Sequence, residues 1–593
     1  MNTLFRLFRS LKLLFIKYFP GVLKFISIEI LIVFVYIVSI NFYFGNVGEK
    51  IKADGIGYYD YLPSIFIHHD IIRKDVPFKK DSDLYSRIND IGIYVEYEEF
   101  LVNKYPCGTA LLELPFFLFT YLVTDIEGDS LTGYERPFHT TVFHAALFYL
   151  FLSLLFLKGT LRLFGIRKHM ITLIQVLLVL ATTVTNYAHF DAAFSHIYSL
   201  FAITGFIYFA KSYFSRKDLK YFMLACLLLG LVVILRQTNI LILLFIPFLA
   251  GSMNNLKDGF LYLWRQPVFL VAGILVTFGI FSIQGLLWYV QTGKFLIMSY
   301  QGEGFNFHDP YFFSILFGYG KGLFVYTPIL FTALISMIWL LHKREFFLVI
   351  TWFGFFIILT YILSSWWNWF FGDSLGLRAY IDFYTIFFIP VALMLNGLNP
   401  KIKAGVVSIL LLTIPVNYIQ TVQYKEFIFH WNSMEKEMFW KVFLRTNPKY
   451  KGLLWKINYD FSQFQMIGGK EIGAFAIPPQ EIDTLYEIHS SIIPDYQDVS
   501  IIQVLFDSDF KRKNDSQFSL TIRDEAGDQI HYYHIISFVQ FVEEGFREWQ
   551  TGQYNFKFAP LTENKDVRIT LKIESGKVRT EIKNLRIRYF KPI

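Results

Sequence analysis

The 593-residue sequence contains only two cysteines, Cys107 and Cys226, and both lie in or beside apolar segments. These two cysteines give no basis for a disulfide framework, and they leave the redox compartment open. Charged residues are also scarce, at 17% of the chain, whereas 54% of the residues are hydrophobic and 19% are aromatic. A water-soluble globular protein could not bury so much apolar surface, so the composition predicts a polytopic membrane protein.

The chain also lacks internal repeats and low-complexity tracts. Its formal net charge of +7 comes from lysines and arginines that cluster between apolar runs. Such basic loops are typical of segments that face an anionic inner leaflet, so we expect no nucleic-acid partner.

Apolar runs of about the length that a membrane-spanning helix needs, roughly 20 residues, recur along the first 421 residues. The eleven predicted spans lie near 22–44, 138–157, 170–188, 195–210, 221–235, 238–251, 267–288, 323–341, 346–363, 379–397 and 403–421. Basic residues precede the first span and follow the second and fourth, which places the N-terminus in the cytoplasm. The first run is too long for a signal peptide, so we expect an integral cytoplasmic (inner) membrane protein.

The run "GTALLELPFFLFTYLV", at 108–123, is apolar but short, and it contains a glutamate and a proline. Counting it as a span would move the basic loop after residue 157 to the outside. We therefore interpret it as a helix at the outer interface, within one long external loop over 45–137.

With this orientation, the unusual polar residues gather on the outer face. Ionisable residues near a membrane are costly and usually mark a site or a pathway. The residues concerned are Asp54, Asp60, Lys104, Asp191, His196, Arg236, Glu303, His308, Asp373 and Arg378. A carboxylate can act as a general base on a hydroxyl, and Arg or Lys can bind phosphate. Together with many Trp and Tyr residues, this mixture favours group transfer from a lipid phosphate at the outer surface.

Several motifs then resemble, in order, those of GT-C glycosyltransferases, the group that includes protein O-mannosyltransferases and the lipid A aminoarabinose transferase. "DGIGYY", just after the first span, resembles the D-[EG]-x-x-Y signature of the first external loop. The further matches are "KYPCGTALLELPFF", "FSHIYSLFA", "LRQTNILIL", "GKGLFVYTPIL" and "WWNWFFGDSLGLRAYIDFYTIFFIP". The resemblance covers roughly residues 20–420.

The resemblance implies an enzyme that takes a sugar from a polyprenyl phosphate or pyrophosphate and inverts its anomeric configuration. Asp54 would be the catalytic aspartate and Asp60 a second catalytic candidate, although Asp60 could simply face water. Lys104, Arg236 and Arg378 would bind the donor phosphate. The remaining substrate-binding candidates are Tyr58, Tyr59, Asp191, His196, Glu303, His308 and Asp373.

One departure from the family concerns metal ions. Gly55 stands where many relatives have an acidic residue, which leaves assistance by a divalent metal open. His68 and His69, next to Asp70, could suggest a metal site, but no further ligand follows at a recognisable spacing. We therefore predict no metal site and no cofactor.

The tryptophans of the late motif have two interpretations. Trp366, Trp367 and Trp369 fit an interfacial belt better than a sugar platform.

The chain changes character after the last predicted span. Short alternating runs such as "FSLTIRD" and "VRITLKIES", separated by turns, predict a jelly-roll-like β-sandwich over 470–593. Eleven spans from a cytoplasmic N-terminus would place this domain on the extracytoplasmic side. Residues 425–469 would be a connector, and 1–424 the GT-C-like transmembrane domain. A likeness to carbohydrate-binding sandwiches is an analogy of fold only.

The predicted function is therefore glycosyl transfer, with a polyprenyl-phosphate sugar, a lipid, glycan or protein acceptor and the bilayer as partners. A transporter or flippase of lipid-linked glycans is one alternative. Transporters tend to have midplane charges and two repeated halves, which this sequence does not show. A non-catalytic scaffold for glycan assembly is the other alternative.

Overall fold

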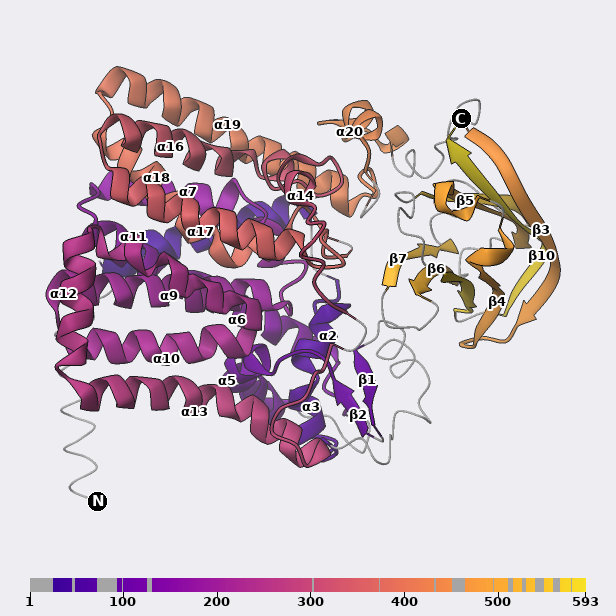
Figure 1. The fold of residues 1–593 in the computed structure, drawn as a ribbon, viewed down its shortest axis with the longest axis horizontal. Helices are drawn as coiled ribbons and strands as arrows, with labels where there is room; N and C mark the ends of the chain where they lie inside the picture. The colour runs from indigo at the N-terminus through magenta and orange to yellow at the C-terminus, as the bar shows by residue number, and fades with distance from the viewer. Residues whose placement is uncertain are drawn as a thin grey trace.

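The computed structural model describes residues 25–44, 48–71, 93–98, 100–124, 131–300, 303–372, 374–430, 434–450, 464–493, 495–509, 516–524, 530–538, 549–557, 566–576 and 579–592. A large helical part is followed by a smaller C-terminal part built of strands (Figure 1).

Seven helices in the described residues are long and apolar enough to cross a membrane. They are Phe25–Phe44, α6 (Arg136–Leu163), α9 (Ser195–Arg216), α13 (Pro267–Thr292), α17 (Phe346–Ser364), η4 with α18 (Arg378–Gly397) and α19 (Pro400–Lys425). An eighth crossing results if η2–α11 (Gln237–Ala250) and α12 (Met253–Trp264), which are bent by 116°, form one span. The structure is thus that of a membrane protein, as the composition predicts.

All eleven predicted spans coincide at least in part with helices, but several of these helices are short. The shorter apolar helices are α5 (Gly108–Val123), α7 (Lys168–Leu180), α10 (Leu219–Leu235) and η3–α16 (Pro328–His342). The predicted spans at 170–188, 221–235 and 323–341 fall on such helices, and the one at 238–251 is half of the bent pair. The count of eleven spans therefore stays a prediction.

Two elements form the centre of the helical bundle. In α9, 83% of the most apolar 18-residue stretch is buried inside the protein, and in η4–α18 the corresponding share is 89%. By contrast, α13 and α19 bury only 17% of theirs and expose apolar faces. The central elements can therefore hold polar side chains that the outer helices could not.

The predicted first external loop forms small elements at one end of the bundle. These are α2 (Asp54–Tyr59), α3 (Tyr61–Phe66), and the hairpin of β1 (Tyr94–Tyr97) and β2 (Phe100–Asn103), followed by α5. Figure 1 shows them at the end opposite α12. The short helices α8 (Val184–Tyr187), α14 (Phe312–Phe317), α15 (Leu323–Tyr326) and α20 (Lys436–Val442) lie in connections.

The C-terminal part has two antiparallel four-stranded sheets. One has the order β3 (Phe464–Ile477), β10 (Thr580–Pro592), β5 (Ile501–Asp509), β8 (Trp549–Lys557). The other has the order β4 (Ile482–His489), β9 (Val567–Glu574), β6 (Gln517–Asp524), β7 (Ile530–Ser537). Phe506 of the first sheet and Phe518 of the second share one apolar core, so the sheets pack face to face. The jelly-roll topology stays a prediction.

Candidate functional site

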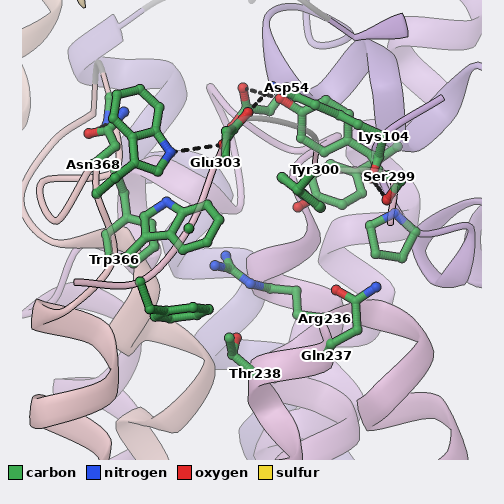
Figure 2. Close-up of a pocket in the computed structure, with 18 of the residues that line it drawn as sticks. Asp54, Lys104, Arg236, Gln237, Thr238, Ser299, Tyr300, Glu303, Trp366 and Asn368 are labelled. Carbon is green, nitrogen blue, oxygen red and sulfur yellow. Dashed lines mark hydrogen bonds and ion pairs between the residues drawn. The ribbon is translucent and has the colours of Figure 1, made fainter. Parts of the chain in front are cut away.

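A cavity of about 720 Å³ opens at the end of the bundle that carries α2 (Figure 2). Its wall comes from segments that are distant in the sequence: α2, the turn after β2, the start of α9, the junction of α10 and η2, and the loops after α13 and α17. Each of these segments lies where a helix ends or begins. Backbone breaks between helices thus supply the polar groups of the cavity.

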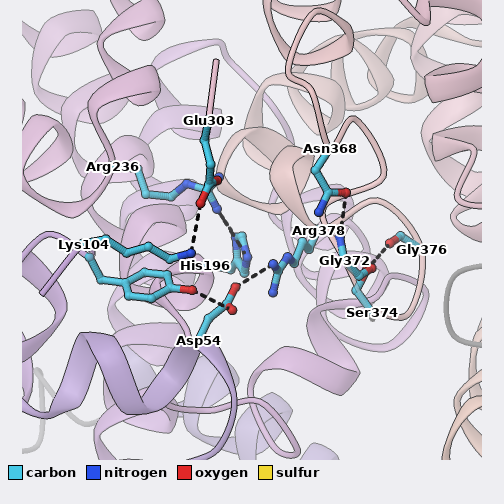
Figure 3. A network of polar contacts seen from close by, with 11 residues as sticks. Asp54, Lys104, His196, Arg236, Glu303, Asn368, Gly372, Ser374, Gly376 and Arg378 are labelled. Atoms are coloured by element: carbon cyan, nitrogen blue, oxygen red, sulfur yellow. Dashed lines mark hydrogen bonds and ion pairs between the residues drawn. The ribbon is translucent and has the colours of Figure 1, made fainter. Parts of the chain in front are cut away.

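Asp54, the first residue of α2, points its carboxylate into the cavity. Its Oδ2 lies 2.6 Å from Nη2 of Arg378, and the Tyr105 hydroxyl donates a hydrogen bond of 2.9 Å to Oδ1 (Figure 3). Ala53, just before it, has φ +46°, a conformation that residues with a side chain rarely adopt. Such strain before a cavity carboxylate is typical of functional sites.

The residue after Asp54 has a steric reason to be glycine. A Cβ on Gly55 would lie 2.8 Å from the Cβ of Ala193, so no side chain fits there unless the backbone moves. This contact accounts for the glycine at position 55. A second carboxylate at position 55 is therefore incompatible with the packing of α2 against the segment before α9.

Two opposing effects act on the Asp54 carboxylate. Burial raises its pKa, but the charges of Arg378 and Lys104 and the hydrogen bond from Tyr105 outweigh burial and hold the pKa below its ordinary value. Asp54 is therefore ionised at neutral pH. An ionised carboxylate can accept a proton from a hydroxyl that is placed beside it.

Lys104 contributes a second ion pair to the cavity. Its Nζ lies 3.1 Å from Oε1 of Glu303, and the indole of Trp367 donates a hydrogen bond of 3.1 Å to Oε2 of the same carboxylate. Figure 3 shows the Lys104 side chain reaching the Glu303 carboxylate. The aromatic ring of Tyr300 lies 5.8 Å from the Lys104 ammonium. This corner combines charge with flat apolar surface, which suits a sugar attached to a phosphate.

Arg236 provides a third cation, at the break between α10 and η2. Its Nε lies 3.6 Å from Oδ2 of Asp382, and its Nη1 lies 3.2 Å from Nδ1 and 3.4 Å from Nε2 of His196. His196 Nδ1 lies 2.8 Å from Oδ1 of Asp382, and the amide of Asn239 donates a 3.0 Å hydrogen bond to Oδ2. Three residues thus contact one another pairwise.

The structure brings seven of the twelve candidate residues to this cavity. They are Asp54, Tyr58, Lys104, His196, Arg236, Glu303 and Arg378. Trp366 and Trp367 line it as well, whereas Trp369 stacks on Tyr311. Two of the three tryptophans therefore line the cavity, and the choice between an interfacial belt and a sugar platform stays a prediction.

The other candidates lie elsewhere. Asp60 does not line the cavity: it is fully buried, and the hydroxyls of Tyr94 and Tyr134 donate to it. The hydroxyl of Tyr59 donates to the backbone oxygen of Gly133 at 2.7 Å, also outside the cavity.

Asp191 also lies outside the cavity wall, where it pairs with Lys52 at 3.2 Å and accepts a 2.6 Å hydrogen bond from Asn186. His308 is exposed on the loop after α13. Asp373 lies outside the described residues.

Sequence reasoning missed several residues of the site. Tyr105 stands inside the quoted "KYP" motif, and Asp382 stands inside the quoted motif that contains Arg378. Because η4 is a 3-10 helix with three residues per turn, the spacing of four residues between Arg378 and Asp382 gave no signal that the two belong to one site. Tyr300, Gln237, Thr238 and Asn368 also line the cavity, and nothing in a single sequence singles them out.

No family model, no curated protein and no solved structure matches this chain. In the part of the chain that the structure describes, no group of three or more His, Cys, Asp and Glu side chains could hold a metal ion. The chemistry of the site is thus argued from its own residues. They offer an ionised carboxylate, three cations and aromatic surfaces around one space.

Proposed function

We propose that this protein is an integral-membrane glycosyltransferase that moves a sugar from a polyprenyl-phosphate donor to the hydroxyl of an acceptor. The observation that carries the proposal is that one cavity brings together Asp54, the cations Lys104, Arg236 and Arg378, and Trp366. The resemblance of the motifs to GT-C glycosyltransferases leads to the same reaction.

The donor fits the chemistry of the cavity wall. A phosphodiester is an anion, and Arg and Lys are the side chains that bind it best. Apolar residues of the same wall, among them Phe281, Ile297 and Leu363, offer contact to the first isoprene units next to the phosphate. Tyr300 and the indoles of Trp366 and Trp367 offer flat faces for the sugar.

The reaction is a single displacement at the anomeric carbon. The acceptor oxygen forms the new glycosidic bond while the bond from the anomeric carbon to the phosphate oxygen breaks, so the configuration inverts. The acceptor proton passes to the Asp54 carboxylate, and the polyprenyl phosphate leaves with both electrons of the broken bond. The three cations stabilise the negative charge that develops on this leaving group.

The distribution of basic residues supports an extracytoplasmic cavity. The cavity lies at the start of α9 and at the ends of α10, α13 and α17. The opposite ends of these helices carry Lys217, Lys220, Arg265 and Lys343. Because basic loops stay in the cytoplasm, we place the cavity and the C-terminal sheets on the outer side of the membrane.

The test is sugar transfer by the purified full-length protein in lipid nanodiscs. The protein is incubated with a panel of polyprenyl-phosphate sugars and a membrane extract, and new glycosylated products are detected by mass spectrometry. The proposal requires a product that depends on both donor and protein, and that the Asp54→Asn variant fails to form.

Two other results would contradict the proposal. Transbilayer movement of the donor in proteoliposomes without any transfer would identify a flippase. Tight donor binding with neither transfer nor movement would identify a scaffold.

A further inference from the structure

Asp382 is a fully buried carboxylate, with 0% of its surface exposed, and it stands directly behind the cavity. It belongs to η4 (Arg378–Phe383), the same short helix that presents Arg378 to Asp54. Asp382 does not line the cavity itself. Its effect on a ligand must therefore pass through another residue.

Two of the three polar partners of Asp382, His196 and Arg236, belong to the cavity wall, and the third, Asn239, is buried beside it. Its Oδ1 faces His196 Nδ1 at 2.8 Å, and its Oδ2 receives Asn239 at 3.0 Å and faces Arg236 Nε at 3.6 Å. His196 in turn contacts Nη1 of Arg236. With Nδ1 donating to Asp382, Nε2 keeps the lone pair of the imidazole, and Nη1 of Arg236 lies at nearly equal distances from the two nitrogens, 3.2 Å from Nδ1 and 3.4 Å from Nε2.

This arrangement fixes the orientation of Arg236. A guanidinium has five N–H donors in a rigid plane, so holding Nε sets the direction of the two terminal nitrogens. Figure 2 shows the Arg236 guanidinium extending into the cavity, away from the wall. Asp382 faces Nε and His196 contacts Nη1, which leaves Nη2 for a ligand in the cavity.

The other two cations of the cavity are held differently. Arg378 and Lys104 pair with Asp54 and Glu303, whose side chains are 27% and 17% exposed and line the cavity themselves. An incoming phosphate can replace such partners, because the carboxylate can then be solvated or can bind another ligand group. Asp382 has no such access, so losing its partners would leave a buried charge unpaired.

We propose that Asp382 is a positioning residue, which acts through Arg236 and His196 to hold the Arg236 guanidinium as a fixed anchor for the phosphate of the donor. The inference rests on the proposed function for the identity of the ligand. It adds that the three cations have different roles in binding the phosphate. Arg236 is preorganised before the donor binds, whereas Arg378 and Lys104 exchange carboxylate partners for phosphate oxygens.

The experiment measures equilibrium binding of a short-chain polyprenyl phosphate, without a sugar, to the full-length protein in nanodiscs. Asp382→Asn should weaken binding by roughly ten- to a hundredfold, the usual effect of removing a residue that orients an ion-binding group. Arg236→Gln should have a similar effect. The double variant should bind no more weakly than Arg236→Gln alone, because Asp382 acts only through Arg236.

Glu29→Gln is the matched control. Glu29 is also fully buried, also pairs with a cation, Lys158, at 2.6 Å, and also accepts a hydrogen bond from an amide, that of Gln175. Neither Glu29 nor Lys158 lines the cavity. The control should lower the thermal unfolding temperature as Asp382→Asn does, but it should leave binding of the polyprenyl phosphate unchanged.

Arg236→Lys tests the proposal even if Asp382→Asn does not fold. Lysine keeps the charge but has a single ammonium nitrogen. If the buried Asp382 carboxylate holds this nitrogen, no second nitrogen is left for the phosphate, so binding should weaken roughly tenfold or more. If transfer is observed, the donor KM should rise in both variants while the acceptor KM stays the same.

Three results would overturn the proposal: wild-type affinity in Asp382→Asn, additive losses in the double variant, or wild-type affinity in Arg236→Lys. Failure of the wild-type protein to bind the polyprenyl phosphate would also overturn it. The proposed function fails separately, if the protein binds this probe with the expected pattern of variants and transfers no sugar from any donor of the panel.

Discussion

Two ion pairs in this protein have the same length and opposite surroundings. Asp54 and Arg378 are 2.6 Å apart at the cavity, and Glu29 and Lys158 are 2.6 Å apart inside the helical bundle. The second pair joins the helix Phe25–Phe44 to α6, and Gln175 of α7 donates to the same carboxylate. It is almost completely buried, whereas the first pair borders the cavity.

The comparison shows that distance alone does not tell what an ion pair does. A buried pair has already lost its water, so its two members depend on each other and hold the elements that carry them. A pair at a cavity can exchange partners with a ligand, so its members are available for chemistry. Changes at the two pairs should therefore separate activity from stability.

The largest effect is expected for Asp54→Asn. This change keeps the shape of the side chain and removes its capacity to accept a proton, so turnover should fall by about 10²- to 10⁴-fold. Binding of the donor should change little. Initial rates of sugar transfer at saturating donor measure the effect.

Asp60→Asn is the companion variant, since Asp60 is buried outside the cavity. It should reduce turnover much less than Asp54→Asn. Full turnover in Asp54→Asn together with an inactive Asp60→Asn would reverse the assignment.

Changes at the interior pair of Glu29 and Lys158 should lower stability and leave binding unchanged. Lys158→Met leaves Glu29 buried without its cation, so the free energy of unfolding should fall by about 3 to 5 kcal/mol. The affinity of the folded protein for a polyprenyl phosphate should not change. Thermal unfolding in detergent, followed by binding measurements below the transition, tests both statements.

A double change refines this test. Glu29→Leu combined with Lys158→Met removes both charges, so it should recover much of the lost stability. If Lys158→Met weakened binding without loss of stability, the interior pair would belong to the site and the comparison would fail.

A smaller effect concerns pH. Arg378 is the main influence that lowers the pKa of Asp54 against the effect of burial. Arg378→Gln removes this influence and keeps the burial, so the pKa of Asp54 rises. The acidic limb of the pH profile of transfer should therefore move to higher pH. An unchanged acidic limb in the variant would show that another group controls it.

The same change has a consequence for stability. In the wild-type protein the lowered pKa of Asp54 favours folding above the pKa of the unfolded chain, and this contribution is lost as pH falls through the folded pKa. Arg378→Gln should lack that contribution at neutral pH. Its unfolding temperature should consequently change less than that of the wild-type protein between neutral and acidic pH.

Much of the fold follows from local sequence patterns. Apolar runs predict helices because burial and backbone hydrogen bonding favour helices in a membrane. Residues 108–123 do form a helix, α5, which is shorter than the long apolar spans, and its position at the outer interface stays a prediction. The run at 221–235 matches α10 closely, whereas the run at 170–188 is longer than α7, because hydropathy does not indicate where a backbone breaks against polar neighbours.

Residues of the site could be predicted where an ionisable side chain stands beside an apolar run. Asp54, Lys104, Arg236 and Arg378 stand out in the sequence because ionisable residues beside apolar runs are costly. Asp60 stands out for the same reason, yet tyrosines from β1 and from the segment before α6 enclose it. Which of two aspartates six residues apart faces the cavity depends on tertiary contacts that the local pattern does not contain.

The short helices also determine the depth at which the cavity lies. With 13 residues α7 rises about 20 Å, and with 17 residues α10 rises about 26 Å, against a hydrocarbon thickness of about 30 Å. In the proposed orientation, the segments that follow them, leading to His196 and Arg236, would lie below the membrane surface. The prenyl chain of the proposed donor could then stay in the bilayer while its phosphate reaches the cations, so binding would not require the lipid to be lifted into water.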